Sequence, residues 1–206
     1  AMALVRLISV AATIALAILF GAALGLFPSR ISGMAMTRVR RRFSNLACRI
    51  LGIKVVFDGQ IPRDRPVILV ANHVSWTDIL ALGGIMPITF LARHDVADWP
   101  ALGQLARIYG TLFIERGRLR QIPSINRQMA LRLERGETVG LFPEATTGDG
   151  TRLKKFSAVH FAAARSLLEM RPELTSVDIA PVVIAYTRRS GLPLGRAGRA
   201  AVAWYG

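Results

Sequence analysis

From residue 52 onward, short apolar runs alternate with segments of helical period, and this alternation restricts the fold more than any other feature of the chain. The runs are rich in Val, Ile and Phe and read IKVVF, PVILVA, ITFLA, TLFIE, TVGLF and APVVIAY. Between them lie TDILALGGI, WPALGQLARIYG, SINRQMALRLERG and SAVHFAAARSLLEM, in which apolar residues recur at helical spacing. Such alternation predicts an α/β fold with a mostly parallel sheet flanked by helices.

The length of the chain fits one such domain with an appendage. Its 206 residues, of which 52% are hydrophobic, can bury one core but hardly two independent ones. We therefore assign residues 52–206 to a single α/β domain. The chain starts with Ala-Met-Ala and stops within a strand-like AVAWYG, so we expect a tag remnant or a truncated end, the C-terminus included.

Residues 7–27 contain no charged side chain and are mostly apolar. A helix of this length rises about 1.5 Å per residue and spans ~30 Å, the thickness of the hydrocarbon core of a bilayer. A cleaved signal peptide is the alternative, but its basic region would hold only Arg6 and no clear A-x-A site closes the run. We therefore predict that residues 1–28 form a membrane anchor helix.

Residues 29–51 combine an apolar stripe with a group of arginines. The stripe recurs at three- and four-residue steps and consists of Met36, Val39, Phe43, Leu46 and Ile50. The arginines lie mostly off the stripe, at positions 38, 40, 41, 42 and 49. This pattern predicts a basic amphipathic helix on an anionic membrane surface, and the positive-inside rule then places the following domain in the cytoplasm. Packing of the stripe on the domain's own core is the alternative.

The charge of the chain narrows the choice of partners. Its 27 basic and 13 acidic residues leave a formal net charge of +14, which favours a nucleic acid, an anionic membrane or a phosphorylated substrate. The basic residues are dispersed, and no RNP, zinc-finger or helix-turn-helix signature is present, so we expect no nucleic-acid partner. Cys48 is the only cysteine, which excludes an internal disulfide and a cysteine-based metal cluster.

The first of three polar loops follows the run PVILVA and holds His73 and Asp78. In open α/β sheets, ligands bind where loops leave the carboxyl ends of strands. The two side chains meet only if the chain turns between them into the next helix. A histidine oriented by a carboxylate takes a proton from a hydroxyl group, which is the task of a general base in acyl transfer. A helix-capping Asp78 and a His73 bonded to a backbone carbonyl fit the same spacing equally well.

The other two loops offer groups that bind oxyanions. Glu115 and Arg116 end the run TLFIE, where the arginine can hold a phosphate with two hydrogen bonds or form a surface ion pair. Glu144 follows the run TVGLF and precedes Ala-Thr-Thr-Gly, whose hydroxyls and backbone N–H groups suit a phosphate or thioester oxygen. A plain surface turn is the alternative for this third loop.

Taken together and in this order, NHVSWTD, GTLFIERG, LFPEATT and IAPVVIAY resemble the four sequence blocks of the glycerolipid acyltransferase family, which includes lysophosphatidic acid acyltransferases. The resemblance extends over residues 66–186. It implies a lysolipid acceptor, acyl-CoA or acyl-carrier protein as the acyl donor, and neither a metal nor another cofactor. The site residues that it implies are His73 and Asp78 for catalysis, and Arg116, Glu144 and Thr146 for acceptor binding.

The third block departs from the family pattern, because Ala145 replaces a glycine and Thr147 stands where an arginine is usual. A phosphate-bearing acceptor is correspondingly less well supported. The Thr-Thr sequence and the later YTRRSGLPLGR are similar to the bacterial branch that acylates lyso-ornithine lipid.

The resemblance predicts a membrane-bound O-acyltransferase of phospholipid biosynthesis, of the 1-acylglycerol-3-phosphate type, at the bacterial inner membrane with its catalytic domain facing the cytoplasm. A lyso-ornithine lipid O-acyltransferase is the first alternative. An inactive membrane-tethered lipid-binding protein and a thioesterase-like hydrolase are the others, although the G-x-S-x-G elbow of many hydrolases is missing from the sequence.

The mechanism that we expect is direct attack of the acceptor hydroxyl on the thioester, with His73 Nε2 as the base and no acyl-enzyme. The remaining histidines receive other roles: His94 is expected at the surface and His160 in packing. Cys48 is expected to be a buried or membrane-facing thiol rather than a nucleophile.

Overall fold

The computed structural model describes residues 29–62, 64–100, 102–115, 117–189 and 191–195, with isolated positions at 8, 11, 12, 15, 19, 198 and 203. They divide into two compact units, a first unit of Ala1–Gln60 and Ile79–Leu119 and a second unit of Ile61–Asp78 and Arg120–Gly206. The predicted anchor at residues 1–28 lies outside the described residues apart from the isolated positions. Among the helices that the structure does describe, none has the length and apolar character needed to cross a bilayer.

The second unit is built on three parallel strands. Strand β1 (Val67–Ala71) lies between β4 (Thr138–Leu141) and β5 (Asp178–Val182), and both pairings are parallel. Every residue of β1 and β4 is buried, which explains why these runs are continuously apolar instead of alternating. Burial of each large side chain of β1 contributes about 1.5–3 kcal/mol relative to an exposed position.

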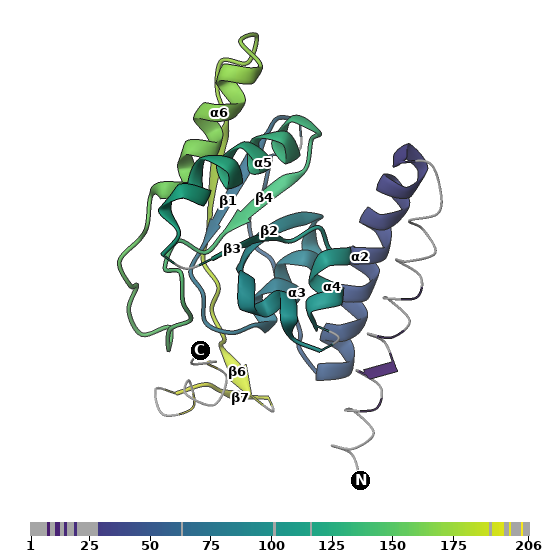
Figure 1. Cartoon of the computed structure of the whole chain (residues 1–206). Helices are drawn as coiled ribbons and strands as arrows, with labels where there is room; N and C mark the ends of the chain where they lie inside the picture. The colour runs from purple at the N-terminus through teal and green to yellow at the C-terminus, as the bar shows by residue number, and fades with distance from the viewer. Residues whose placement is uncertain are drawn as a thin grey trace. The chain divides into compact units, whose positions relative to one another are not determined.

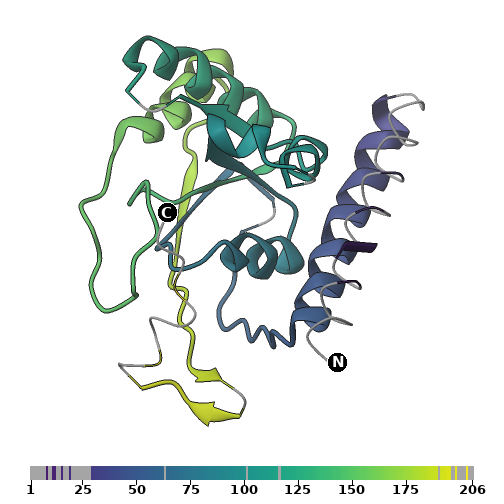
Figure 2. The same ribbon diagram turned by 60° about the horizontal axis from the view of Figure 1, so that its bottom comes forward.

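Helices complete the second unit. Helix α5 (Ile122–Glu134) lies against β4, and α6 (Ala162–Met170) lies against α5 after a short 3-10 turn, η3 (Val159–Phe161) (Figure 1). Their buried faces centre on Met129, Leu133 and Leu167, which are almost fully inaccessible. Beyond β5, the short strands β6 (Arg188–Arg189) and β7 (Leu192–Pro193) form an antiparallel hairpin at the end of the segment that leaves the sheet (Figure 2).

The first unit contains helices and a pair of parallel strands, β2 (Ile88–Arg93) and β3 (Leu112–Ile114). Its helices are α2 (Ser29–Leu51), most of α3 (Thr77–Ile85), α4 (Leu102–Ile108) and a 3-10 turn, η1 (His94–Asp98). Helices α2, α3 and α4 lie side by side (Figure 1) and share a buried cluster of Phe43, Ala47, Cys48, Leu80, Leu105 and Tyr109. The rings of Phe43 and Tyr109 meet edge to face with centroids 5.6 Å apart, a favourable aromatic geometry.

Parallel strands with intervening helices confirm the predicted α/β class. The prediction of a strand at residues 53–57 is wrong, since this segment has no regular structure. Ile53 is half-buried, but the side chains that follow it are exposed, with Val56 at 79% and Val55 and Phe57 at 39% each. A strand needs a hydrogen-bonded neighbour as well as β-branched residues, and none of the described strands pairs with this segment.

Helix α2 has the range predicted for the basic helix, but its buried face differs from the predicted stripe. Phe43 is buried as expected, whereas Leu46 is 47% exposed. Among the side chains of the helix that the structure describes, from residue 36 on, the other buried ones are the small residues Ser44, Ala47 and Cys48. The reason lies in α3, where a Cβ on Gly83 would be 2.8 Å from Ser44 Oγ. Because the two helices approach so closely at a glycine, the contact selects small side chains over large apolar ones.

The arginines of α2 remain largely on its outer side. Arg38, Arg41, Arg42 and Arg49 are exposed, and Arg41 Nε also donates to the carbonyl of Gly84 at 3.2 Å. The helix therefore packs one face on the core of its own unit, which is the alternative that the sequence left open, and keeps a cationic face outside. Contact of that cationic face with a membrane stays a prediction.

Candidate functional site

The loop that follows β1 is fixed at its start by Asn72. The Asn72 side chain donates from Nδ2 to the carbonyl of Ile184 at 3.0 Å and accepts from the Ile184 N–H at 2.7 Å. This pair of bonds reproduces a strand-like pairing just beyond the last residues of β1 and β5. The residue after Asn72 is thereby held at the carboxyl end of the sheet, where ligands bind in folds of this class.

His73 and Asp78 come together in this loop. His73 Nδ1 lies 2.8 Å from Asp78 Oδ2. The chain turns at residues 74–76 and enters α3, so that two residues five positions apart face each other, as the sequence required for a pair. Asp78 is fully buried, while the His73 side chain keeps 17% of its surface exposed.

The Asp78 carboxylate accepts three further hydrogen bonds. Oδ2 accepts from the backbone N–H groups of Val74 at 2.7 Å and Ser75 at 2.9 Å, and Oδ1 accepts from the Tyr186 hydroxyl at 2.6 Å. A buried charge is costly unless such bonds replace its lost hydration. The network therefore both compensates the burial of Asp78 and fixes the direction of its oxygens toward His73.

Tyr186 and Thr77 form the outer part of the network. Burial and the neighbouring Asp78 carboxylate raise the pKa of Tyr186 well above its usual value, so the phenol keeps its proton and donates it to Asp78. Thr77 Oγ1 lies 2.6 Å from the Tyr186 oxygen. Because the single phenolic proton goes to the carboxylate, the Thr77 hydroxyl is the donor in this second bond.

The hydrogen-bond pattern assigns the tautomer of His73. Since a carboxylate only accepts, the proton on the imidazole must lie on Nδ1 in the neutral ring. Nε2 then carries a lone pair, and no described residue hydrogen-bonds to it. Nε2 of this partly exposed side chain is thus the atom that can take a proton from a bound hydroxyl.

The loop after β4 supports His73 from its other sides. The Phe142 ring stacks on the imidazole with centroids 4.0 Å apart and planes 16° apart. Glu144 Oε1 accepts from the His73 backbone N–H at 3.1 Å, and the Gly148 N–H donates to the His73 carbonyl at 2.8 Å. The ring plane and both backbone groups of His73 are therefore fixed by residues of one loop.

Glu144 is 7% exposed, and its second oxygen accepts from the Lys154 N–H at 2.9 Å. Both oxygens are therefore engaged by backbone groups, and the residue ties the third loop to the first. Acceptor binding by Glu144 stays a prediction, as it does for the half-buried Thr146.

Ala145 has a φ of 55°, in the left-handed region that favours glycine. This conformation costs an L-residue about 1–2 kcal/mol. The position where the family pattern has glycine thus keeps a glycine-like backbone even though the side chain has changed.

The remaining predicted residues fall elsewhere. Arg116 lies outside the described residues, so its predicted contact with the acceptor stays a prediction. His94 is exposed and Cys48 is buried, as expected. Burial raises the pKa of the Cys48 thiol, which disfavours the thiolate that a nucleophile needs. His160 Nδ1 contacts Asn126 Oδ1 at 3.1 Å, which confirms a packing role with one bonded nitrogen.

Sequence reasoning missed Tyr186, Phe142 and Asn72 as parts of the site. Asn72 precedes the histidine directly, and Phe142 ends the run TVGLF, so both carried a weak signal as polar or aromatic residues at strand ends. Tyr186 is 108 positions from Asp78. Its only signal was a hydroxyl-bearing aromatic residue at the end of an apolar run.

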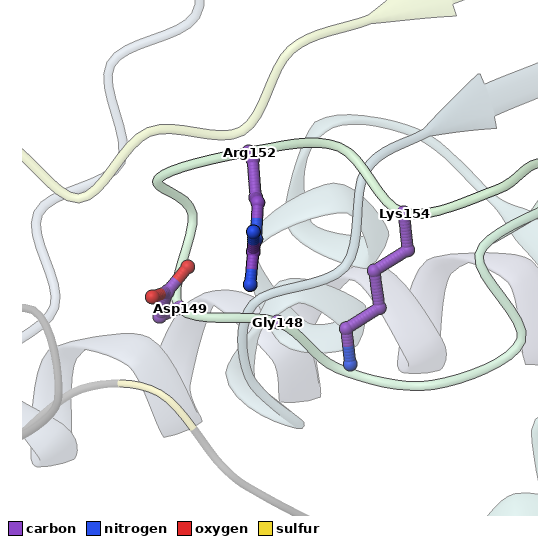
Figure 3. A pocket seen from close by; sticks show the side chains of 4 residues that line it. All are labelled: Gly148, Asp149, Arg152 and Lys154. Carbon is purple, nitrogen blue, oxygen red and sulfur yellow. The ribbon is translucent and has the colours of Figure 1, made fainter.

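A pocket lies beside this site, in the loop after β4. It has a volume of about 190 Å³ and is lined by Gly148, Asp149, Arg152 and Lys154 (Figure 3). Lys154 Nζ donates to the carbonyl of Thr147 at 2.7 Å. In the described part of the chain, no group of three or more His, Cys, Asp or Glu side chains could hold a metal ion.

The chain is similar to a family of known proteins and to individual members with curated names. A family model described as Acyltransferase matches residues 52–185. The lyso-ornithine lipid O-acyltransferase of Rhizobium meliloti (strain 1021) is 41% identical over 166 residues, which cover 81% of this chain and 56% of the relative. The 1-acyl-sn-glycerol-3-phosphate acyltransferase of Neisseria gonorrhoeae is 40% identical over 121 residues, covering 58% of this chain and 46% of the relative.

A solved structure has the same fold. The crystal structure of the 1-acyl-sn-glycerophosphate acyltransferase of Thermotoga maritima superposes with a TM-score of 0.58 at 20% identity, covering 90% of this chain and 83% of that one. The chain spans 56%, 63% and 61% of three curated relatives named lyso-ornithine lipid O-acyltransferase.

Proposed function

Because this chain belongs to the acyltransferase family, we propose that it is a lysolipid O-acyltransferase in which His73 is the general base and Asp78 its charged partner. The observation that carries the proposal is the 2.8 Å contact between His73 Nδ1 and the fully buried Asp78 carboxylate. In the neutral ring this contact puts the proton on Nδ1, so that Nε2 carries a lone pair at the carboxyl end of the sheet.

The mechanism follows from this geometry. The acceptor hydroxyl hydrogen-bonds to His73 Nε2 and loses its proton to it while its oxygen attacks the thioester carbonyl carbon. The new C–O bond forms, the C–S bond breaks, and the leaving thiolate takes the proton back from the imidazolium. Asp78 stabilises the imidazolium while it exists, and the ester and free thiol leave without an acyl-enzyme intermediate.

Lyso-ornithine lipid is the acceptor that the comparisons favour over lysophosphatidic acid. Three relatives named for lyso-ornithine lipid match 81%, 82% and 80% of this chain, whereas the Neisseria relatives named for glycerol phosphate match 58%. Thr147 at the usual position of an arginine in the third block supports the same choice.

The donor and the location belong to the same proposal. We propose acyl-CoA or acyl-carrier protein as the acyl donor, with no metal or other cofactor, because the dyad supplies the only acid–base step that the reaction needs. The exposed arginines of α2 and the uncharged run before it support a place on the cytoplasmic side of a bacterial inner membrane.

Acyl transfer to purified lysolipids tests the function. Detergent-solubilised protein is incubated with a labelled acyl thioester and, separately, lysophosphatidic acid or lyso-ornithine lipid, and the lipid products are resolved. We expect a product with at least one acceptor, and a rate about 10²–10⁴-fold lower in His73→Ala. His94→Ala, which removes an exposed histidine outside the site, is the matched control and should retain the rate.

Three results would contradict the proposal. Equal rates in His73→Ala and the parent protein would show that His73 is not the general base. Cleavage of the thioester that does not depend on any lysolipid would indicate a hydrolase. Folded protein that binds lysolipid without turnover would indicate a lipid-binding protein instead.

A further inference from the structure

The pocket beside His73 carries charges of both signs. Arg152 and Lys154 extend from one limb of the loop toward the limb that holds Gly148 and Asp149 (Figure 3). The volume of about 190 Å³ is many times the ~10–15 Å³ that a cavity needs to hold one water, so a group of several heavy atoms fits. Two cations and one anion leave this pocket with a net charge of +1.

The pocket is connected directly to the proposed base. Its wall at Gly148 donates a backbone hydrogen bond to the His73 carbonyl at 2.8 Å. A Cβ on Gly148 would be 3.6 Å from Lys154 Cε, 3.9 Å from Glu144 Oε2 and 3.9 Å from the His73 oxygen. A head group held here therefore lies beside the backbone of His73, the residue whose side chain is the proposed base.

Hydrogen bonds orient Asp149 and Lys154, and all three charged side chains keep unused bonding capacity. Asp149 Oδ1 accepts from the Thr151 N–H at 2.9 Å and from the Thr151 hydroxyl at 2.6 Å, and these bonds lower the pKa of Asp149 so that it stays ionised. Its Oδ2 remains available to a ligand. The Arg152 guanidinium makes no hydrogen bond or ion pair with any described residue, although its charge acts on Asp149.

Lys154 is held from both ends of its side chain. Its backbone N–H donates to Glu144 Oε2, and its ammonium donates to the Thr147 carbonyl at 2.7 Å. An ammonium has three donors, so two remain for a ligand. The pocket thus has a cationic side, made of Arg152 and the hydrogen-bonded Lys154, and an anionic side made of Asp149.

The net charge of +1 admits either kind of head group, but only a zwitterion finds a partner for each of its charges on both sides of the pocket. A phosphate monoester carries a charge of about −1.5 to −2 at neutral pH, so the ionised Asp149 beside the two cations opposes it. An N-acylated ornithine keeps one carboxylate and one side-chain ammonium, which match the two sides. The acidic residue is the feature that a phosphate site would not need.

We propose that this pocket binds the head group of a zwitterionic amino-acid lysolipid, with its carboxylate on Arg152 and Lys154 and its ammonium on Asp149. The inference rests on the proposed function, since it names the class of acceptor that the acyltransferase site takes. Asp149 is then the residue that selects against a phosphate acceptor.

Acceptor preference in charge-neutralised variants tests the pocket. In detergent, kcat/KM is measured for lyso-ornithine lipid and for lysophosphatidic acid in the full chain, Asp149→Asn and Arg152→Gln. We expect Asp149→Asn to lower kcat/KM for lyso-ornithine lipid about fivefold, the size of one ion pair near a surface, without lowering the value for lysophosphatidic acid. Arg152→Gln should lower both values. The matched controls are Glu169→Gln and Arg165→Gln, an exposed pair on α6, and should change neither.

A change of equal size for both acceptors in Asp149→Asn, or no change, would overturn the pocket assignment while leaving the acyltransferase proposal intact. Binding of soluble head groups keeps the test independent of turnover. Nα-acetylornithine and glycerol 3-phosphate are titrated into the labelled full chain, and the backbone amide resonances of Gly148 and Gly150 are followed. We expect shifts with Nα-acetylornithine that weaken in Asp149→Asn; shifts with glycerol 3-phosphate alone would reject the proposal.

Discussion

Two histidines of the second unit make similar hydrogen bonds but differ in the charge of the partner, and therefore in their ability to act as a base. His73 and His160 each place Nδ1 within hydrogen-bond distance of a side-chain oxygen, at 2.8 Å and 3.1 Å. The partner of His73 is the carboxylate of Asp78. The partner of His160 is the amide of Asn126, whose Nδ2 donates to the Val159 carbonyl at 3.1 Å. In both cases the neutral ring carries its proton on Nδ1.

The two histidines therefore have the same neutral tautomer, but only His73 has a negatively charged partner that could stabilise an imidazolium. An imidazolium at position 73 would face a buried negative charge, whereas one at position 160 would face only an amide dipole. Burial lowers the pKa of His160, so that ring stays neutral in the folded protein. A hydrogen bond alone thus orients a histidine, and the charge behind it decides whether the ring can act as a base.

The largest effect is expected when the His73 site is converted into the His160 type. Asp78→Asn keeps the shape of the side chain but removes the charge. Its NH₂ group opposes the Tyr186 hydroxyl if it takes the place of Oδ1, and the N–H groups of Val74 and Ser75 if it takes the place of Oδ2. We expect kcat to fall by about 10³–10⁴-fold, as general-base sites of this kind do when the acid becomes an amide. Rates at saturating acceptor and thioester measure it, with thermal unfolding as the check on folding. A loss below tenfold would mean that the charge of Asp78 is dispensable.

The next effect concerns the hydrogen bond that the Tyr186 hydroxyl donates to Asp78, the partner of His73. Tyr186→Phe keeps the ring and removes the hydroxyl that donates to Asp78 Oδ1. A bond to a charged group is worth about 1.5–3 kcal/mol, so we expect kcat to fall by roughly 10- to 100-fold with little change in KM. Tyr109→Phe is the matched control, because its hydroxyl donates to the Arg40 carbonyl in the first unit. If both variants change kcat alike, Tyr186 has no particular role at the dyad.

A moderate effect is expected from His160, in the pH dependence of the free energy of unfolding. The pKa of His160 is lowered in the folded protein, so below about pH 6.5 the unfolded chain binds a proton that the folded chain does not. The free energy of unfolding should therefore fall as the pH drops below that value. Asn126→Asp gives His160 a carboxylate partner and should flatten this part of the pH dependence without changing kcat. Urea unfolding at several pH values decides, and an unchanged profile in Asn126→Asp would contradict the assignment.

The smallest effect is expected at Ala145, in the turn after Glu144, which accepts a hydrogen bond from the His73 N–H. Ala145 has a φ of 55°, a strain that has no counterpart among the described residues around His160. Ala145→Gly relieves it but gives the unfolded chain more freedom, so we expect a net gain of about 0.5 kcal/mol in the free energy of unfolding. Ala164→Gly in α6 is the control and should lose up to about 1 kcal/mol. Equal losses in both variants would show that the turn is not strained.

The alternation of apolar runs and helical segments determined the α/β class by itself, because the period of apolar residues is a local property of the chain. The same locality located His73 and Asp78 after one strand and Glu144 after another. A strand that turns into a helix can bring residues five apart together, so neighbouring sequence allowed the contact of His73 with Asp78, and the structure decided it against the helix-capping alternative.

Tertiary structure decided what surrounds that pair. Tyr186 reaches Asp78 because β5 pairs with β1 in a register that sets Pro181 opposite Val70, and no local pattern specifies a register between strands so far apart. Phe142 and Gly148 reach His73 because β4 lies on the other side of β1. The buried face of α2 and the lack of a strand at residues 53–57 have the same origin. Each depends on which segment, distant in the sequence, packs against it, and the spacing of apolar residues within a segment carries no information about that partner.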